Sequence, residues 1–504
     1  MKKEELSSRK AVAVFDVGKT NKKLLIYDSN LTLLESSSEQ FDAVESGDVF
    51  VETTDETFAW LQGALSKATG KHDIGCISIA AHGAACACLD ESGGPVFPVL
   101  SYTTDPGDEF HQEFYREFAD PRALQRLTFT PDMPGLGSLA KVLYYIKTRH
   151  PDKFGDIRTI LPLPQYYSYL MTGVAGVENT YLANHTYLWD FEKNDWSDVA
   201  RGLGVAGLFP APVKRPWDVL GTISPEFAKK TGLASDVIVS LGIHDSNASL
   251  LPYLITTRDD FVLNSTGSVC VAMHPTDRVG LADDELGKMV FYNQNAYGNP
   301  VKIAFFLGGM EFDAYMGLIT QAAGQKDFPG IDEAQVEKVL ADRSLFILPS
   351  MVSIGMFPES PARVVEGDRV YPFGNLFTGE VPEFFSDFNT AYTVLSVGLA
   401  LQTKAALDRV GLRDGMPLFV EGGFRSNEVY TAVLSALYPA SNLSLTNMEE
   451  ATAFGTALVG KAALEGVDPK ALTNLFQIEK REITARKLPG LEGYANAFFG
   501  MVDA

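Results

Sequence analysis

The sequence predicts an α/β protein of two related domains with a cleft between them. Its 504 residues exceed what one compact core usually holds. Two similar units, each a strand, a glycine-containing turn and a second strand, begin at Ala11 and Phe261, at the starts of the two halves of the chain. An internal duplication would place them there. We therefore expect one domain over residues 11–252 and a second over 253–480.

The composition argues against several kinds of partner. Hydrophobic residues make up 46% of the chain and charged residues 21%, an ordinary balance for a folded protein. The net charge of -22 repels phosphate backbones and anionic lipid, so we expect neither nucleic acid nor membrane as a partner. The N-terminal segment Met1 to Lys10 is charged, and no apolar run is long enough to span a bilayer. These features predict a cytoplasmic protein without a secretory signal.

The four cysteines lack the spacing of a zinc site or of a disulfide framework. They are Cys76, Cys86, Cys88 and Cys270. Cys86 and Cys88 alternate in a stretch that predicts a strand, so both should point to one face. We expect reduced, mostly buried thiols.

The first unit consists of two apolar runs, Ala11 to Phe15 and Leu24 to Tyr27, joined by a tight turn. The turn contains a glycine, a hydroxyl and an amide, and backbone N–H groups in such a hairpin can face an anion. Lys19 and Lys23 add positive charge. Asp16, at the end of the first strand, is suited to holding a divalent cation through water. The alternative is an ordinary hairpin with a solvated basic tip.

Asp245 follows the apolar run Val237 to Leu241, which predicts a buried strand, so we expect it where that strand ends and a loop begins. An aspartate fixed at a strand end can accept a proton from a substrate hydroxyl or position a metal ion. The alternative is an aspartate that only caps the following segment, Ser246 to Leu251.

The second unit, Phe261 to Ser268 followed by the apolar run Val269 to Met273, again predicts a hairpin with a hydroxyl-rich glycine turn. A plain hairpin is the alternative. Further on, the strand Pro417 to Val420 leads into a glycine pair and then into a helix over Glu428 to Leu437. The glycine pair lets a flat ligand approach the backbone beside a helix N-terminus. A last helix over Glu450 to Leu464 is rich in alanine and glycine, which favours close packing.

The order of these motifs resembles the FGGY family of carbohydrate kinases, whose superfamily shares the fold of actin. The two hairpin turns are similar to the family's two phosphate motifs, and Gly422-Gly423 with Ser426-Asn427 to its adenosine motif. Gly242 to Asp245 matches the place of the catalytic aspartate, in a Gly-x-His-Asp form nearest to the rhamnulose-kinase branch. The resemblance implies two actin-like (ribonuclease H-like) domains with a catalytic cleft between them. The first domain would bind the sugar and carry the first phosphate motif, and the second would bind the nucleotide.

The resemblance also implies the site residues. ATP would contact Gly18, Lys19, Thr20, Asn21, Lys23, Ser265, Thr266, Gly267, Ser268, Gly422, Gly423, Ser426 and Asn427. The sugar would contact His82, Gly83, Asp105, His244 and Asp245. Asp16 and Asp245 would hold Mg²⁺, and Asp245 would be the general base.

Three positions depart from the family's pattern. Lys19 stands where a small or hydroxyl residue is usual, and could contact phosphate or crowd the turn. Phe424 replaces a frequent third glycine and could reshape the adenine pocket, and no arginine follows Asp105. For His82 the alternative is a histidine satisfied at a strand end, and for Asp105 a turn residue before proline.

The expected activity is ATP-dependent phosphorylation of a sugar hydroxyl, on a deoxyketohexose such as rhamnulose or fuculose, or on a pentulose. The alternative is a non-catalytic sugar or nucleotide sensor with the same fold. Because dimers are common in the family, a homodimer is also a possible state.

Overall fold

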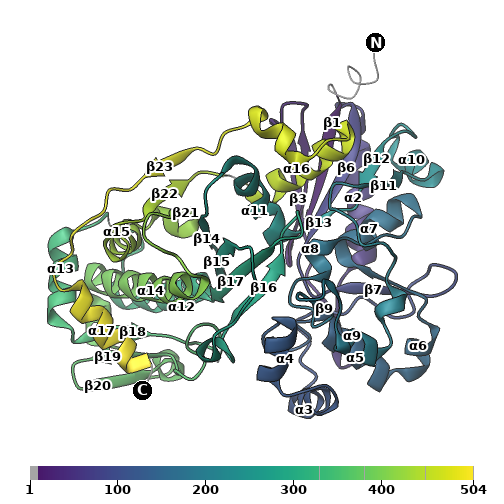
Figure 1. Cartoon of the computed structure of the whole chain (residues 1–504). Helices are drawn as coiled ribbons and strands as arrows, with labels where there is room; N and C mark the ends of the chain where they lie inside the picture. Colours follow the sequence, from purple (N-terminus) through teal and green to yellow (C-terminus); the bar gives the residue numbers. More distant parts are fainter. Residues whose placement is uncertain (1–9, 329, 353, 380, 449, 503–504) are drawn as a thin grey trace.

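The computed structural model describes residues 10–502 apart from 329, 353, 380 and 449. The predicted lack of a secretory signal concerns residues 1–9, which lie outside this range. The chain forms two lobes, each built around one large sheet (Figure 1). In the described part of the chain, no helix is both long and apolar enough to cross a membrane.

The sheet of the N-terminal lobe has the order β11-β12-β6-β1-β2-β3, and β13 continues beside β6. Its strands are β1 (Ala11–Val17), β2 (Asn21–Tyr27), β3 (Leu33–Gln40), β6 (Ile74–Ala81), β11 (Val219–Thr222), β12 (Ile238–Ser240) and β13 (Ile243–His244). The hairpin β1–β2 is antiparallel, whereas β6 runs parallel to β1 and to β12. All eight residues of β6 are buried, as expected for a central parallel strand covered on both faces.

The sheet of the C-terminal lobe repeats this plan, with the order β16-β17-β15-β14-β21-β22-β23. Its strands are β14 (Val262–Thr266), β15 (Cys270–Pro275), β16 (Val290–Gln294), β17 (Pro300–Phe306), β21 (Pro417–Gly422), β22 (Asn442–Thr446) and β23 (Lys480–Glu482). Here too an antiparallel hairpin, β14–β15, is flanked by parallel strands, β21 and β22. The predicted duplication is therefore confirmed at the level of strand topology.

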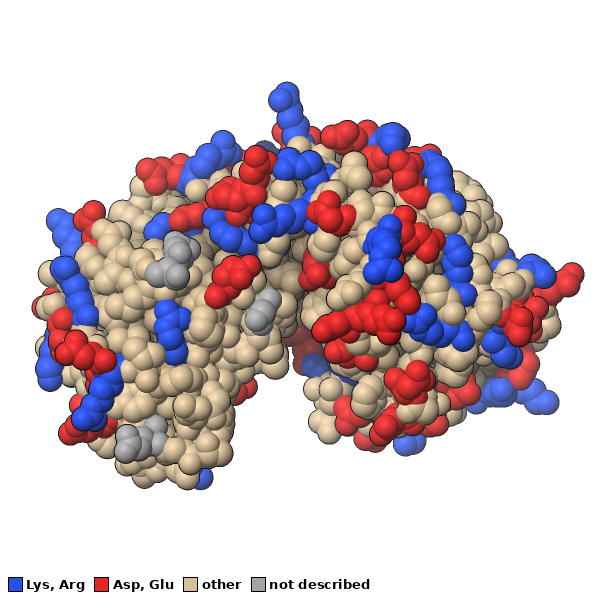
Figure 2. Space-filling model, turned by 90° about the horizontal axis from the view of Figure 1, so that it is seen from below, with Lys and Arg blue, Asp and Glu red and all other residues tan. Residues whose placement is uncertain are grey.

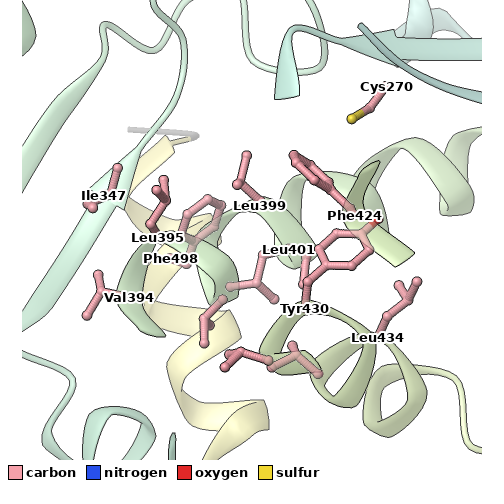
Figure 3. Packing of buried hydrophobic residues seen from close by; sticks show 14 of the residues in the cluster. Cys270, Ile347, Val394, Leu395, Leu399, Leu401, Phe424, Tyr430, Leu434 and Phe498 are labelled. Carbon is pink, nitrogen blue, oxygen red and sulfur yellow. The ribbon is translucent and has the colours of Figure 1, made fainter. Parts of the chain in front are cut away.

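Other elements cover the sheets and extend the lobes. In the N-terminal lobe they are α2 (Thr54–Thr69), α3 (Asp108–Glu117), α4 (Pro121–Thr128), α5 (Leu139–Arg149), α6 (Pro151–Asp156), α7 (Leu163–Thr172), α8 (Asn179–Leu182), α9 (Asp198–Leu203), α10 (Pro225–Thr231), β4 (Val44–Ser46), β5 (Val49–Val51), β7 (Cys86–Leu89), β8 (Thr159–Pro162), β9 (Trp189–Asp190) and β10 (Asp195–Trp196). In the C-terminal lobe they are α12 (Gly308–Ala323), α13 (Glu333–Asp342), α14 (Phe388–Val410), α15 (Glu428–Leu437), α17 (Leu491–Val502), β18 (Leu345–Leu348), β19 (Arg363–Glu366) and β20 (Arg369–Pro372). Leu395 and Leu399 of α14 lie in the core of this lobe with Phe424, Tyr430 and Phe498 (Figure 3).

The two lobes exchange helices at their junction (Figure 1). Helix α16 (Ala451–Glu465), from the second half of the chain, packs its alanines against β1 and β6 of the first lobe. Helix α11 (Asp245–Thr256), from the first half, packs Tyr253 against Phe261 and Phe419 of the second lobe. The helices touch closely, because a methyl group on Gly455 would lie 1.8 Å from the carbonyl oxygen of Ala248. The predicted alanine- and glycine-rich helix is thus confirmed.

Two local predictions can be compared with the structure. The four cysteines are free and buried, as expected. The expectation that a loop begins at Asp245 is wrong, because Asp245 is the first residue of α11. His244 is the N-cap of this helix: its Nδ1 accepts a hydrogen bond from the N–H of Ser246. The buried apolar residues of α11 make the helix the more stable continuation.

Candidate active site

The two acidic residues singled out in the sequence lie on either side of the end of β6. Asp16 of β1 is in register with Ala80, and His244 of β13 with Ala81. Gly242, with φ +90°, permits the bend between β12 and β13, and a Cβ there would lie 2.7 Å from the carbonyl oxygen of Ile79. The side chain of Asp245 is 33% exposed, and its Oδ1 accepts a hydrogen bond from the N–H of Ser246 at 2.5 Å. Asp245 therefore faces open space from a fixed position.

Asp16 is buried and lies close enough to Asp245 for that charge to affect its pKa. Burial and the nearby charge of Asp245 raise the pKa of Asp16 from its ordinary 3.8 to about 7, although Lys23 opposes the shift. The ammonium of Lys23 lies 2.6 and 2.7 Å from the carboxylate oxygens of Glu450, the residue before α16. A buried carboxylate beside a second one is stabilised in its ionised form by a cation, so this pair is suited to holding one.

Lys19 turns its ammonium away from the tip of the first hairpin, a geometry that does not favour a phosphate contact from that side chain; the contact stays a prediction. Its Nζ lies 2.5 Å from Oε1 of Glu52, donates to Ser101 Oγ, and stands 4.8 Å from the ring centre of Tyr102. Glu52 is only 6% exposed. Burial raises the pKa of Glu52, but the charges of His82 and Lys19 outweigh it, so the net shift is downward.

His82 stands behind this ion pair. Its Nδ1 lies 3.1 Å from the carbonyl oxygen of Gly83, and its Nε2 is buried, 3.9 Å from Oε2 of Glu52, without a hydrogen-bond partner among the described residues. Burial lowers the pKa of His82 despite the opposing charge of Glu52. Because the ring is buried, His82 is better placed to position Glu52 than to contact a sugar. The sugar contact stays a prediction from the sequence.

Gly83 is brought close to His244, as predicted, and also to His185, which sequence reasoning missed. A Cβ on Gly83 would lie 2.7 Å from Nε2 of His185 and 2.9 Å from Nε2 of His244. The backbone N–H of His244 donates to Thr180 Oγ1, which in turn donates to the buried carboxylate of Glu178. His185 lies three residues after α8 and belongs to none of the motifs that the sequence indicated.

Asp105 does not lie with Gly83, His185 and His244. Its side chain is 76% exposed, and its Oδ1 accepts a hydrogen bond from the N–H of Gly107 at 2.9 Å. This geometry is that of a turn residue, the alternative that the sequence left open.

The turn of the first hairpin holds Gly18, Thr20 and Asn21, which join β1 to β2. Gly18 is needed here, since a Cβ would lie 2.9 Å from the carbonyl oxygen of Asn21.

The turn of the second hairpin and Gly423 of the glycine pair line one cavity of about 530 Å³ in the C-terminal lobe. Of the predicted nucleotide contacts it includes Thr266, Gly267, Ser268, Gly423, Ser426 and Asn427. Gly422 has φ +84° and a Cβ would lie 1.9 Å from the carbonyl oxygen of Thr266, so no other residue fits there. Ser265, just before Thr266, lies opposite Glu421 on β21.

Two of the predicted contacts have structural duties. The hydroxyl of Thr266 donates to the carbonyl of Glu421 and accepts from the N–H of Phe424. The side chain of Asn427 caps α15 by accepting from the N–H of Tyr430. The side chains of Thr266 and Asn427 are thus already engaged in hydrogen bonds within the protein.

Aromatic rings complete the cavity. Phe312 of α12 lies 5.9 Å from Phe328 and 5.6 Å from Phe424 between ring centres, and Phe328 lies 5.8 Å from Tyr392 of α14. Phe328 is 60% exposed. Such rings can stack on a flat base, so Phe424 shapes the cavity without closing it.

A notch separates the two lobes when the molecule is seen from below (Figure 2). The C-terminal lobe beside it presents a broad face with few charged side chains, in contrast to the acidic surface of the N-terminal lobe.

Comparisons with known proteins agree across the chain. Residues 11–252 match the N-terminal domain of the FGGY family of carbohydrate kinases, and residues 258–469 match the C-terminal domain of FGGY carbohydrate kinases. A carbohydrate kinase from Novosphingobium aromaticivorans has a similar structure, with a TM-score of 0.79, 27% identity, and coverage of 98% of this chain and 99% of that one.

Two curated relatives are more distant in sequence. A rhamnulokinase of Halalkalibacterium halodurans is 22% identical over 240 residues, 47% of this chain, and the match spans half of that protein. An L-xylulose/3-keto-L-gulonate kinase of Escherichia coli is 22% identical over 402 residues, 79% of this chain and 75% of that protein.

Proposed function

The chain belongs to the FGGY family of carbohydrate kinases, and we propose that it transfers the γ-phosphoryl group of ATP to a hydroxyl of a ketose. One observation carries the proposal most directly. Asp245, partly exposed and held by its own helix, stands beside Asp16 at the junction of the two lobes, so sugar and nucleotide sites would meet there.

In this mechanism the protein mainly positions the reactants and offsets charge. Asp245 accepts the proton of the sugar hydroxyl as that hydroxyl attacks the phosphorus atom. Backbone N–H groups of the turns at residues 18–21 and 266–268 hold the phosphates from the two lobes. The adenosine occupies the cavity lined by Phe312, Phe328 and Gly423.

The residues at the junction fit a magnesium ion. The described residues contain no group of three or more side chains suited to a metal, but Mg²⁺ commonly binds through one or two carboxylates, phosphate and water. Asp16 and Asp245 supply two carboxylates, and a cation would offset both the burial of Asp16 and the nearby charge of Asp245, which together raise the pKa of Asp16. The ion would offset charge on the phosphates during transfer.

For the sugar, His244 before Asp245 favours a deoxyketohexose such as rhamnulose or fuculose, with a pentulose such as xylulose or ribulose as the next candidate. The names of the two curated relatives include both kinds of ketose. The homodimer and the cytoplasmic location remain predictions from the sequence.

The test is a coupled assay of ADP release with MgATP against ketoses, aldoses and polyols, with wild type and Asp245→Asn. We expect strong turnover with one ketose and a loss of at least about 10²-fold in the variant, with ATP binding retained. Turnover by the variant above about a tenth of the wild-type rate would contradict the general-base role. ATP binding without stimulation by any sugar would instead favour a sensor.

A further inference from the structure

We propose that His185 is a specificity-determining residue for the sugar: its Nε2 accepts a hydrogen bond from one substrate hydroxyl, while Nε2–H of His244 donates to a neighbouring oxygen. The inference rests on the proposed kinase function and deepens it.

The hydrogen bonds of the two imidazoles indicate that Nε2 is an acceptor in His185 and a donor in His244. Nδ1 of His185 lies 3.0 Å from the carbonyl oxygen of Gly137, which can only accept, so Nδ1 carries the proton and Nε2 keeps a lone pair. His244 is the reverse, because its Nδ1 accepts from the N–H of Ser246, which leaves the proton on Nε2. The same N–H of Ser246 also donates to Oδ1 of Asp245 at 2.5 Å, and this oxygen lies 3.2 Å from Nδ1 of His244.

Both Nε2 atoms lie close to the backbone of Gly83, on the side where a side chain would stand. A methyl group on Gly83 would lie 2.7 Å from one and 2.9 Å from the other. Among the described residues the hydrogen bonds of the two imidazoles are made by Nδ1, and the two rings stand 6.2 Å apart at 84°. Glycine at this position lets both rings lie against the backbone, so that an acceptor and a donor stand near one another beside Asp245.

His185 lies in a segment with an unfavourable backbone conformation. It has φ 36°, and Tyr187 two residues later has φ 62°, conformations that are uncommon for non-glycine residues. An isolated β-bridge between Asn184 and Asn293 ties this segment to the other lobe, and the His185 ring stands edge-on to Phe291 of β16. Burial lowers the pKa of His185 to about 4, so the ring is neutral at physiological pH.

The charges nearby imply that the substrate carries no carboxylate. Each lysine of the first hairpin is engaged: Lys19 with Glu52, Lys22 with two carbonyl oxygens, and Lys23 with Glu450. Asp16 and Asp245 add negative charge, which repels a sugar acid. We therefore expect an uncharged ketose to be preferred over the sugar acid of the same chain length.

Two variants separate recognition from folding. His185→Asn tolerates positive φ and can still donate to Gly137, but it ends short of Nε2. His185→Gln reaches farther and offers an acceptor. We expect kcat/KM for the best ketose to fall about 30-fold or more in the Asn variant and to recover in part in the Gln variant, with KM for ATP changed less than about twofold. His72→Asn, on the outer surface beside Glu35, is the matched control.

The decisive measurement pairs these variants with altered sugars. Wild type should discriminate against one deoxy or epimeric ketose, and His185→Asn should lose that discrimination, which a purely structural role would not produce. Equal discrimination in wild type and variant, or a sugar acid such as 3-keto-L-gulonate or gluconate used as well as any ketose, would overturn the inference and leave the kinase function standing. Absence of turnover with every compound would refute the proposed function, and the inference with it.

Discussion

Replacing Asp16 with asparagine should stabilise the protein at neutral pH and abolish its activity. The pKa of Asp16 is raised from 3.8 to about 7, a shift of about three units. At about 1.4 kcal/mol per unit, keeping this carboxylate ionised costs the folded protein up to about 4 kcal/mol. Because the side chain is partly open to the cleft, water screens part of this cost. We expect a gain of about 2 kcal/mol for Asp16→Asn at pH 8.

The pH dependence follows from the sign of the shift. Between the unfolded value of 3.8 and the folded value of about 7, the folded protein binds more protons than the unfolded chain, so the free energy of unfolding falls as pH rises through this window. The asparagine variant cannot titrate there. Its advantage should therefore be full above pH 7 and vanish near pH 4.

Urea denaturation in EDTA at several pH values measures this difference without metal. Asp259→Asn, an exposed carboxylate on the C-terminal lobe, is the control and should stay within about 0.5 kcal/mol of wild type. Turnover of Asp16→Asn with MgATP should fall at least about 10²-fold. A variant less stable than wild type at pH 8, or a difference that is the same at pH 5 and pH 8, would refute the electrostatic reasoning.

Three further substitutions test other parts of the structure. Phe328→Ala removes an exposed ring of the proposed adenosine cavity, and should raise KM for ATP about tenfold with kcat nearly unchanged; steady-state kinetics with an unaltered KM would argue against stacking. Lys19→Met leaves Glu52 buried without its cation and should cost about 3 kcal/mol in urea denaturation, much of which Lys19→Met with Glu52→Gln should restore. Gly455→Ala forces a methyl group against the backbone of α11 and should lower thermal stability strongly, whereas Gly70→Ala, with open space around it, should not.

Local motifs could be predicted from the sequence because each is specified within about a dozen residues. The hairpins β1–β2 and β14–β15 and the helix after the glycine pair were found in this way, and their recurrence gave the duplication. The start of α11 was missed because the cap is a histidine, a residue with little capping preference.

Side-chain directions at the site could not be predicted, because they depend on partners far away in sequence. Lys19 turns toward Glu52, which directly follows β5, and no local pattern in the sequence indicated this partner. The aromatic wall of the cavity combines Phe312, Phe328 and Tyr392 from separate elements. His185 had no motif of its own beyond its neighbours.

The exchange of α11 and α16 means that neither half of the chain contains all of its own lobe. A cut between Thr257 and Arg258 would leave the first fragment without the helix that covers β1 and β6, and the second without the helix that covers β21 and β22. Each fragment alone should expose apolar surface and aggregate, while the two mixed in equal amounts should reassemble. The peptide bond between the two halves would then not be needed for folding, because the packing of α11 and α16 would hold the lobes together.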